Sequence, residues 1–443
     1  MGTKLTLTTD RATNGLRGDI RVPGDKSMSH RAVMFSSLAK GTSKITGLLE
    51  GEDVMATLAA FRAMGVEAEG PNDGNLTIKG VGMRGLTAPE TDLDMGNSGT
   101  AMRLMCGILA AQNFASKLVG DASLSTRPMR RVTVPLTSMG ARCATDEDGC
   151  PPIHVRGVEK LEPIDYKLPM ASAQVKSAVL LSGLYADGET SVTEPAPTRD
   201  HTERMLKAYG YECETEKLNE HASTIRIKGG GELTATDMDI PSDISSAAFF
   251  MVAASIVPGS DILLKHVCIN PTRTGVNDVL KAMGADIKLV NPRAIGGEPV
   301  ADIRVTYVGL KGCEIDPNLV PLAIDEFPVI CVAAACAEGV TTVSGAEELR
   351  AKESDRISVM VEGLRNIGVE VEERRDGMVV TGGGITGGMV ESHHDHRIAM
   401  SFAIAGGVSE QAITINGAET VATSFPNFVE LAASAGLNIS VQS

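Results

Sequence analysis

The chain has 443 residues, of which 43% are hydrophobic and 22% charged, and its formal net charge is −15 at pH 7. That length exceeds what one ordinary hydrophobic core organises, so two or three domains are expected. The negative charge, the absence of tryptophan and an aromatic content of 3% argue against a general nucleic-acid binder, which needs cationic surface and stacking platforms. An acidic chain can still bind anions if its cations gather in one place.

Neither the apolar runs nor the cysteines point to a membrane or an extracellular protein. The longest uncharged apolar run, 247–257, is far too short to span a bilayer. The eight cysteines form no C-x-x-C pair and no metal-ligand spacing, and Cys331 and Cys336 lie in an apolar run typical of core thiols. With no secretory signal, a reducing cytoplasm is the expected location.

Two short patterns recur six times along the chain. The first is an amphipathic stretch that closes on a residue-glycine step before a predicted strand, at Gly65, Gly140, Gly210, Gly284, Gly368 and Gly436. The second is a polar or charged turn that opens an apolar stretch 39 to 44 residues before each glycine, at Gly24, Gly96, Ala171, Asp243, Asp325 and Asp395. Two patterns that stay in phase predict six repeated α/β units with helix starts in equivalent positions.

The first copy shows the content of a unit. Residues 24–39 predict a turn and a helix, 43–47 a strand, and 53–64 a second helix with Asp53 as its N-cap. Two further strands, 66–69 and 76–79, flank the hairpin signal Pro71-Asn72-Asp73-Gly74. The unit is therefore turn–α–β–α–β–β, and the fifth copy repeats it around Asp376-Gly377.

The sixth copy is too short for a full unit. After Gly436 only enough chain for one strand remains, so we expect the N-terminal stretch 4–8 to supply the missing strand. Three copies per domain then give a first domain of residues 23–240 and a discontinuous second domain of residues 1–22 plus 241–443. The crossings near Val22-Pro23 and Ile240-Pro241 would form a hinge.

The sharpest motif opens the first copy: Pro23-Gly24-Asp25-Lys26-Ser27-Met28-Ser29-His30-Arg31. Glycine allows close approach of a ligand to the backbone, and the free N–H groups and dipole of a helix start favour an anion. Lys26 and Ser27 would add a charge and a hydroxyl, with Arg31 one turn on along the same face. The alternative is an N-capped surface helix with scattered charges.

The equivalent turns add more cations and a few carboxylates. Gly96 to Arg103 has the same form, the fourth copy at 242–247 has no cation, and the remaining groups are Arg127 to Arg131, Ala171 to Lys176, Asp325-Glu326, Lys352 to Arg356 and His393 to Arg397. Repeat symmetry should bring these turns to one face of each domain. His393, His394 and His396 with Asp395 could bind zinc, but neighbours so close in sequence seldom converge on one ion, and no metal is expected. Asp25 and Asp355 are expected to be helix caps or partners of arginines.

Taken together, these phrases resemble the 5-enolpyruvylshikimate-3-phosphate synthase (3-phosphoshikimate 1-carboxyvinyltransferase) family over nearly the whole chain. The resemblance implies a mixed α/β fold: two domains of three repeated βαβαββ units each, an inside-out α/β barrel with the site in the interdomain cleft. It implies transfer of the enolpyruvyl group of phosphoenolpyruvate to the 5-hydroxyl of shikimate 3-phosphate. No metal or organic cofactor is implied.

The resemblance also implies residue roles. Residues similarly placed to hold shikimate 3-phosphate are Lys26, Ser27, Arg31, Ser172, Ala173, Gln174, Arg199, Asp325 and Lys352. Residues similarly placed to hold phosphoenolpyruvate are Lys26, Gly99, Arg127, Gln174, Arg356 and Arg397. The expected catalytic residues are Asp325 as the base at the hydroxyl, Glu353 as the proton donor at the vinyl carbon, and Lys26.

Three departures from the best-known enterobacterial pattern make the chain look like the second bacterial class. Ala173 replaces a serine, Leu104 replaces a proline, and Thr423-Ser424 stand where a phosphoenolpyruvate-binding lysine often precedes Phe-Pro. Gly99 is the small residue that is alanine in glyphosate-tolerant members, so glyphosate is expected to compete with phosphoenolpyruvate.

Two alternatives remain at this point. A UDP-N-acetylglucosamine enolpyruvyl transferase would share the fold and the donor, although its reactive loop cysteine has no evident counterpart here. A non-catalytic ring clamp of six α/β units would line its hole with scattered cationic helices. The expected partners are the two small substrates, with no nucleic acid and no membrane, and the expected state is a monomer.

Overall fold

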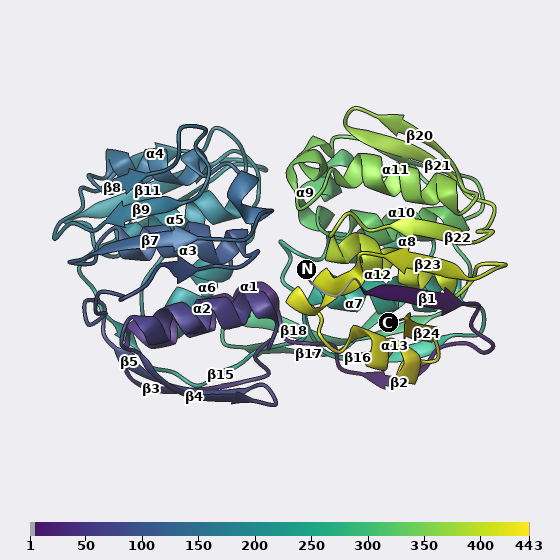
Figure 1. The fold of residues 1–443 in the computed structure, drawn as a ribbon, viewed down its shortest axis with the longest axis horizontal. Helices are drawn as coiled ribbons and strands as arrows, with labels where there is room; N and C mark the ends of the chain where they lie inside the picture. Colours follow the sequence, from purple (N-terminus) through teal and green to yellow (C-terminus); the bar gives the residue numbers. More distant parts are fainter. Residues whose placement is uncertain (1–4, 443) are drawn as a thin grey trace. The chain divides into compact units, whose positions relative to one another are not determined.

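The computed structural model describes residues 5–442, which group into two compact units. Unit 1 comprises the described part of Met1–Pro23, with Pro241–Ala294 and Pro299–Ser443; unit 2 comprises Gly24–Ile240 and Ile295–Glu298. Each unit holds three sheets with helices packed on them (Figure 1). The predicted domains, 23–240 and 1–22 plus 241–443, stay a prediction.

Unit 2 contains the first three repeats. The first has α1 (Lys26–Leu38), β3 (Ala39–Thr46), α2 (Glu52–Ala63), β4 (Glu67–Asn72) and β5 (Asn75–Val81). The second has β6 (Leu93–Asp94), α3 (Gly99–Leu109), β7 (Ala115–Val119), the 3₁₀ helix η1 (Leu124–Thr126), α4 (Arg130–Ser138), β8 (Arg142–Ala144) and β9 (Ile153–Arg156). The third has β10 (Asp165–Lys167), α5 (Ala173–Gly183), β11 (Glu189–Glu194), α6 (His201–Ala208), β12 (Glu214–Lys217) and β13 (Ser223–Lys228). The short strands β14 (Leu233–Thr234) and β15 (Met238–Asp239) pair parallel to β3 and complete the first sheet.

Unit 1 contains β1 (Thr6–Asp10), β2 (Arg17–Ile20) and the last three repeats. The fourth has α7 (Ile244–Ile256), β16 (Asp261–Cys268), α8 (Gly275–Ala282), β17 (Asp286–Ile295) and β18 (Glu298–Thr306). The fifth has η2 (Pro317–Leu319), α9 (Val320–Ala323), α10 (Phe327–Cys336), β19 (Val340–Val343), η3 (Glu347–Ala351), α11 (Arg356–Asn366), β20 (Glu370–Arg374) and β21 (Gly377–Thr381). The sixth has β22 (Gly388–Glu391), α12 (His396–Gly406), β23 (Ile413–Asn416), η4 (Ala418–Thr423), α13 (Phe428–Ala435) and β24 (Asn438–Gln442).

Five of the six sheets described share one topology, in which four strands lie in the order first, second, fourth, third; the sheet of the fifth repeat is β19-β21-β20, without the first strand. The second and third repeats show it as β6-β7-β9-β8 and β10-β11-β13-β12, with the first two strands parallel and the others antiparallel. In the sixth repeat, β1 takes the fourth place between β23 and β24, where Leu7 pairs with both Ile415 and Val441. The prediction that the N-terminal stretch closes the sixth copy is confirmed; Lys4 itself lies outside the described residues.

The first helices of the repeats form the interior of each unit. Every residue of α7 is buried, and α7, α10 and α12 pack on one another. A helix that is apolar on all sides is stable only where it is covered all round. The strands are buried on alternate residues, as in β11, so the sheets cover the helices and present their other face to solvent. No helix among residues 5–442 is long and apolar enough to cross a bilayer.

The six recurring glycines end the second helix of each repeat. Their φ angles lie between +79° and +115°, the left-handed region in which glycine has no steric penalty. The second helix can therefore stop at this glycine, and the chain reverses direction into the next strand of its sheet. This confirms the structural meaning of the residue-glycine step.

In the first repeat, the start of α2 differs from the prediction and the hairpin agrees with it. Asp53 is not the N-cap of α2: the helix starts at Glu52 after an extended Gly51, and the Asp53 carboxylate instead pairs with Lys26. A helix start can be predicted only to within a residue or two. The charge of Lys26 also attracts the Asp53 carboxylate away from the end of α2. The hairpin is confirmed, since Asp73 and Gly74 both have positive φ, as a two-residue type I′ turn requires.

Candidate active site

The turns that open the first helix of each repeat hold most of the candidate residues. In five of the six turns, all within residues 5–442, a side-chain oxygen accepts a hydrogen bond from a backbone N–H in the first helical turn. The capping residues are Asp25, Ser98, Ser172, Asp243 and Asp395. Capping fixes where each helix begins, and so fixes the side chains that follow. Asp25 is therefore a cap, as expected, and Asp355 caps α11 in the same way.

The motif at residues 23–31 does not form a surface helix. Helix α1 is buried from Met28 to Leu38, so that alternative is wrong. Lys26 and Ser27 lie partly exposed at its start, and Lys26 forms an ion pair with Asp53. The motif thus places a paired cation and a hydroxyl at the end of an interior helix.

Arg31 lies deeper than the prediction implied. Its Nε donates to Thr202 Oγ1 at 2.8 Å, its Nη2 to Ser177 Oγ at 3.0 Å and its Nη1 to the carbonyl of Ser27 at 3.0 Å. Burial lowers the pKa of Arg31 to about 10, against the opposing effect of Glu203. Arg31 holds α1 against the third repeat through three of its five N–H donors, which leaves one N–H on Nη1 and one on Nη2 for a ligand.

Gly99 and Arg127 lie together at the start of α3. Arg127 Nη2 donates to Asn97 Oδ1 at 2.7 Å and to Ser123 Oγ at 3.2 Å, which holds the guanidinium in place. A methyl group on Gly99 would lie 3.3 Å from Arg127 Nη1 and 3.4 Å from Arg103 Nη1. Glycine therefore leaves room beside two arginines, and Asn97 is a positioning residue that the sequence did not single out.

The start of α5 joins this group through Gln174. The Gln174 amide donates to Thr100 Oγ1 at 2.9 Å and accepts from Arg103 Nη1. Ser172 caps the helix and Ala173 begins it. Arg199 precedes α6 and is close enough to Arg31 to lower that residue's pKa by like-charge repulsion. The structure thus brings together the predicted residues of unit 2, although Arg103 and Thr100 were not predicted to hold Gln174.

Lys176 differs from the other cations of these turns. It is fully buried, 2.7 Å from Glu203 and 3.1 Å from Glu194. Although burial opposes it, the two carboxylates raise the pKa of Lys176 above its ordinary value. Lys176 is an internal ion pair rather than part of a ligand-facing group.

In unit 1, the candidate residues converge on Arg356, the first residue of α11. Its guanidinium is only 1% exposed and is surrounded by carboxylates. Nε lies 2.8 Å from Asp395 Oδ2, Nη2 lies 2.6 Å from Glu353 Oε2 and 3.2 Å from Asp395 Oδ1, and Nη1 lies 3.5 Å from Asp325 Oδ1. Burial opposes the charge, but Asp395 and Glu353 raise the pKa of Arg356 above its ordinary value.

Lys352 and Arg397 complete this cluster around Asp325. Lys352 Nζ lies 3.6 Å from Asp325 Oδ1 and 2.9 Å from Glu348, while Arg397 Nη1 donates to the carbonyl of Asp325 at 3.1 Å. The predicted base, proton donor and three cations of unit 1 therefore lie in one cluster. The arrangement can bind a carboxylate or phosphate and can exchange protons with it.

Sequence reasoning missed the residues behind this cluster. Asp395 was noted only as part of the histidine turn, yet it is fully buried and holds Arg356. Behind Arg397, Glu326 accepts from Ser245, which in turn accepts from Arg273 at 2.7 Å. The fourth copy, whose turn has no cation of its own, thus acquires one from the segment after β16.

Comparison with known proteins decides the family. The model of the family described as EPSP synthase (3-phosphoshikimate 1-carboxyvinyltransferase) matches residues 11–431. The 3-phosphoshikimate 1-carboxyvinyltransferases of Hydrogenovibrio crunogenus and Methylococcus capsulatus are 59% and 58% identical, each over 426 residues, covering 96% of this chain and 96% of the relative.

The chain belongs to the EPSP synthase family.

A solved EPSP synthase from Acinetobacter baumannii has 55% sequence identity and a TM-score of 0.90, and the match covers 99% of this chain and 100% of that one. The resemblance read from the motifs and the two-part α/β fold it implied are confirmed. A UDP-N-acetylglucosamine transferase and a ring clamp are not favoured, because the match covers 96% of each of these relatives and both are named 3-phosphoshikimate 1-carboxyvinyltransferase.

The position where members of the EPSP synthase family often carry a lysine offers no cation here. Thr423 ends η4 and is buried, and its Oγ1 donates to the carbonyl of Thr420 at 2.7 Å. The following Phe425 is fully buried and packs edge-on against Phe428, with ring centroids 5.3 Å apart. This turn is therefore fixed by packing rather than by a ligand-facing charge.

The histidine turn is not arranged as a metal site. His393 faces Glu362 at 3.5 Å, whereas His394 Nδ1 contacts Glu419 at 2.6 Å, so neighbouring rings point to different carboxylates. Within the described chain, 5–442, no three His, Cys, Asp or Glu side chains are grouped to hold a metal ion.

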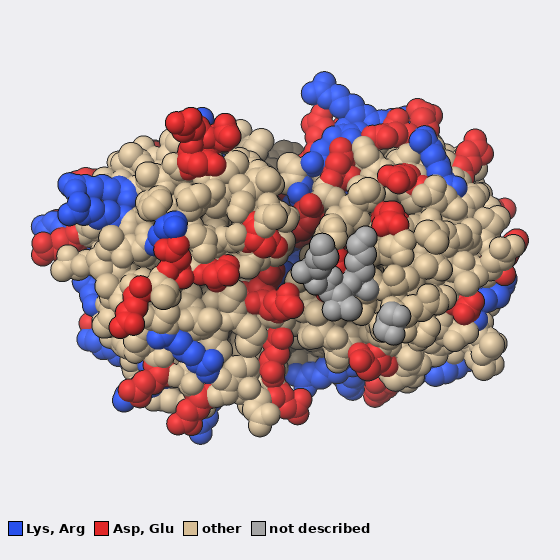
Figure 2. Space-filling view, in the orientation of Figure 1, with Lys and Arg blue, Asp and Glu red and all other residues tan. Residues whose placement is uncertain are grey.

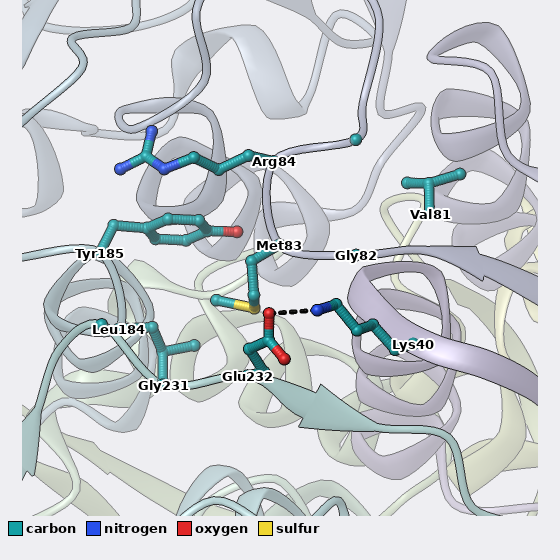
Figure 3. A pocket seen from close by; sticks show the side chains of 11 residues that line it. Lys40, Val81, Gly82, Met83, Arg84, Leu184, Tyr185, Gly231 and Glu232 are labelled. Atoms are coloured by element: carbon teal, nitrogen blue, oxygen red, sulfur yellow. Dashed lines mark hydrogen bonds and ion pairs between the residues drawn. The ribbon is translucent and has the colours of Figure 1, made fainter.

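A cavity of about 430 Å³ lies in unit 2 near the C-terminal end of α5, away from the helix starts (Figure 3). Arg84 lies over the Tyr185 ring, 5.4 Å from its centroid, and donates to the carbonyls of Ala111 and Glu159. Lys40 pairs with Glu232 across the cavity. Its charged groups are thus committed to protein partners, and the cavity shares no residue with the candidate site.

The surface drawn in Figure 2 has no continuous basic area. Lysine and arginine side chains are interspersed with aspartate and glutamate over that face of each unit. On this face the distribution agrees with the net charge of −15 and offers a nucleic acid no cationic track.

Proposed function

We propose that this chain transfers the enolpyruvyl group of phosphoenolpyruvate to the 5-hydroxyl of shikimate 3-phosphate, releasing phosphate, as its family name describes. The observation that carries the proposal at residue level is the cluster in which Asp325 and Glu353 lie against Arg356, with Lys352 against Asp325. It combines cations for two anionic substrates with carboxylates for proton transfer. The proposed location is the cytoplasm, and the proposed state is a monomer.

The residues proposed to bind shikimate 3-phosphate come mainly from unit 2. Lys26 and Ser27 lie at a helix start whose N–H groups and dipole favour a phosphate. Ser172 caps α5, and Arg31 donates to three protein oxygens. The full proposed set is Lys26, Ser27, Arg31, Ser172, Ala173, Gln174, Arg199, Asp325 and Lys352.

Phosphoenolpyruvate carries both a carboxylate and a phosphate, and three of its six proposed ligands are arginines. A planar guanidinium can bind a carboxylate through two parallel hydrogen bonds. Arg127 is held in place by Asn97, and Arg356 by Asp395, so each is oriented before the ligand arrives. The full proposed set is Lys26, Gly99, Arg127, Gln174, Arg356 and Arg397.

The chemical step needs one base and one acid. In the proposed mechanism, Asp325 accepts the proton of the 5-hydroxyl of shikimate 3-phosphate while the hydroxyl oxygen forms a bond to C2 of phosphoenolpyruvate. Glu353 protonates C3 of phosphoenolpyruvate. The tetrahedral intermediate then loses a proton from C3 and expels phosphate, which restores the double bond. Lys26 stabilises the phosphate charge during this step. Each acid or base group typically contributes ~10²–10⁴ in rate.

Glyphosate is proposed to compete with phosphoenolpyruvate beside Gly99. The space next to this glycine is bounded by Arg127 and Arg103, the kind of cationic corner that an anionic inhibitor can fill. The Cβ of an alanine would lie within 3.4 Å of both guanidinium groups, so the corner would become smaller.

The decisive assay is phosphate release from phosphoenolpyruvate, run with shikimate 3-phosphate and, in parallel, with UDP-N-acetylglucosamine. We expect release only with the shikimate ester. Release only with the sugar nucleotide would retain the donor site and overturn the acceptor. No release with either would refute the proposed activity, and the turn at Thr423-Ser424 would be the first place to examine.

A further inference from the structure

We propose that Asp395 is a positioning residue that orients both arginines assigned to phosphoenolpyruvate, Arg356 and Arg397. The inference deepens the proposed function and rests on it. Asp395 touches no proposed substrate atom; it acts through the two arginines.

The two carboxylate oxygens of Asp395 have separate tasks. Oδ2 accepts from Arg356 Nε at 2.8 Å and from Ser354 Oγ at 3.0 Å. Oδ1 accepts from the backbone N–H of Arg397 at 3.0 Å and from Arg356 Nη2 at 3.2 Å. One fully buried carboxylate thus fixes the side chain of Arg356 and the helix start that carries Arg397.

This arrangement determines which part of Arg356 faces a ligand. Asp395 takes Nε, and Asp395 with Glu353 takes Nη2. Among the described residues, Nη1 has no hydrogen-bond partner, although it is buried and lies 3.5 Å from Asp325 Oδ1. A buried N–H group without an acceptor is costly, so Nη1 is the atom prepared for a substrate oxygen.

Removing one partner of a buried ion pair such as this one is strongly destabilising, because the other charge is left buried without compensation. Removing the Asp395 charge would leave Arg356 held by Glu353 alone and free its Nη1 to turn toward Asp325. The expected result is weaker phosphoenolpyruvate binding, whereas shikimate 3-phosphate, assigned mainly to unit 2, would be bound as before.

The test is Asp395→Asn in the full chain, assayed by phosphate release with each substrate varied in turn. The asparagine Oδ1 can still cap α12, whereas its NH₂ group cannot accept from Arg356 Nε. We expect the KM for phosphoenolpyruvate to rise at least tenfold and the KM for shikimate 3-phosphate to change less than twofold. Ser354→Ala, which removes only one hydrogen bond to Oδ2, should raise the same KM about threefold.

The matched control is Asp302→Asn. Asp302 is also a buried aspartate of unit 1, bonded to a backbone N–H and to Arg293, but it lies outside the proposed site. It should lower stability as Asp395→Asn does and leave both KM values within twofold. If Asp395→Asn does not fold, Ser354→Ala decides.

Three results would separate the possible failures. A wild-type chain that releases no phosphate would refute the proposed function and this inference with it. An active wild type whose Asp395→Asn and Ser354→Ala variants keep the phosphoenolpyruvate KM would refute the positioning role alone. An equal rise of both KM values would also refute it, since that pattern indicates a general structural defect.

Discussion

The two units hold their cations in different ways. In unit 2, the arginines at the helix starts donate to neutral oxygens: Arg31 to Thr202 and Ser177, and Arg127 to Asn97 and Ser123. In unit 1, by contrast, Arg356 is paired with carboxylates. A cation held by neutral groups keeps its charge for an anionic ligand, whereas a cation among carboxylates leaves those carboxylates close to the ligand. In the proposed mechanism, this difference corresponds to a division in which unit 2 mainly supplies binding charge and unit 1 mainly supplies proton transfer.

The largest expected effect comes from removing a unit 1 carboxylate. Asp325→Asn keeps the size of the side chain but removes the proposed base, so turnover should fall by ~10²-fold or more. Shikimate 3-phosphate binding, measured by calorimetry, should stay within about tenfold of wild type. Near-normal turnover would remove Asp325 as the base and with it the assignment of proton transfer to unit 1.

Two lysines of unit 2 depart from this pattern: Lys26 pairs with Asp53 at the start of α1, and Lys176 pairs with carboxylates in the interior. Lys176 sharpens the comparison. It is paired with carboxylates, but it is buried and does not face the site, so its loss should reduce stability rather than ligand affinity. Lys176→Met would leave Glu194 and Glu203 buried without their cation, which should cost about 3–5 kcal/mol in denaturant unfolding.

The matched control for Lys176 is Lys79→Met, which breaks the exposed pair with Glu67 and should cost about 0–1 kcal/mol. Equal losses of stability in the two variants would contradict the structural role of Lys176.

A third variant, Arg127→Lys, changes a proposed binding cation of unit 2 without changing its charge. Arg127→Lys keeps the charge but cannot reproduce the fork that bonds to Asn97 and Ser123. We expect the KM for phosphoenolpyruvate to rise roughly tenfold, as loss of a charged hydrogen bond implies. Arg130→Lys, three residues on and exposed, is the control and should leave this KM unchanged. A fall in turnover with no change in KM would place Arg127 in the chemical step instead.

The smallest change concerns the inhibitor. Glyphosate should compete with phosphoenolpyruvate in the wild type, and Gly99→Ala should raise its inhibition constant, because the new methyl group lies 3.3 Å from Arg127 Nη1. Initial rates over a matrix of both concentrations would measure this. Turnover that is unaffected by inhibitor far above the phosphoenolpyruvate concentration would contradict the prediction.

The fold was predictable because its signals are local and repeated. Each residue-glycine step reports a backbone conformation that only glycine adopts readily, and six copies in phase identify the unit. The role of β1 also followed, since the sixth copy lacked one strand. The start of α2 did not, because the side chain of Asp53 is directed by Lys26 from the preceding helix.

The sequence predicted most of the candidate site residues but not which of them contact one another. The motifs identified Arg356 and the turn of Asp395, yet the ion pair between them joins two repeats and depends on the packing of α11 and α12. Sequence spacing likewise could not tell that Arg31 and Lys176 are buried, whereas Lys26 is partly exposed. Such burial is set by neighbours distant in sequence, which a single chain does not reveal.

The most direct test of this division of labour is a calorimetric titration of the double variant Asp325→Asn/Glu353→Gln, paired with a phosphate-release assay. The account predicts that the double variant binds shikimate 3-phosphate with a Kd within about tenfold of the wild-type value. The Kd for phosphoenolpyruvate, measured with shikimate 3-phosphate present, should stay within the same range, while phosphate release falls by at least ~10²-fold. Loss of binding together with loss of turnover would contradict it, because the unit 1 carboxylates would then be needed mainly to bind the substrates rather than mainly to move protons.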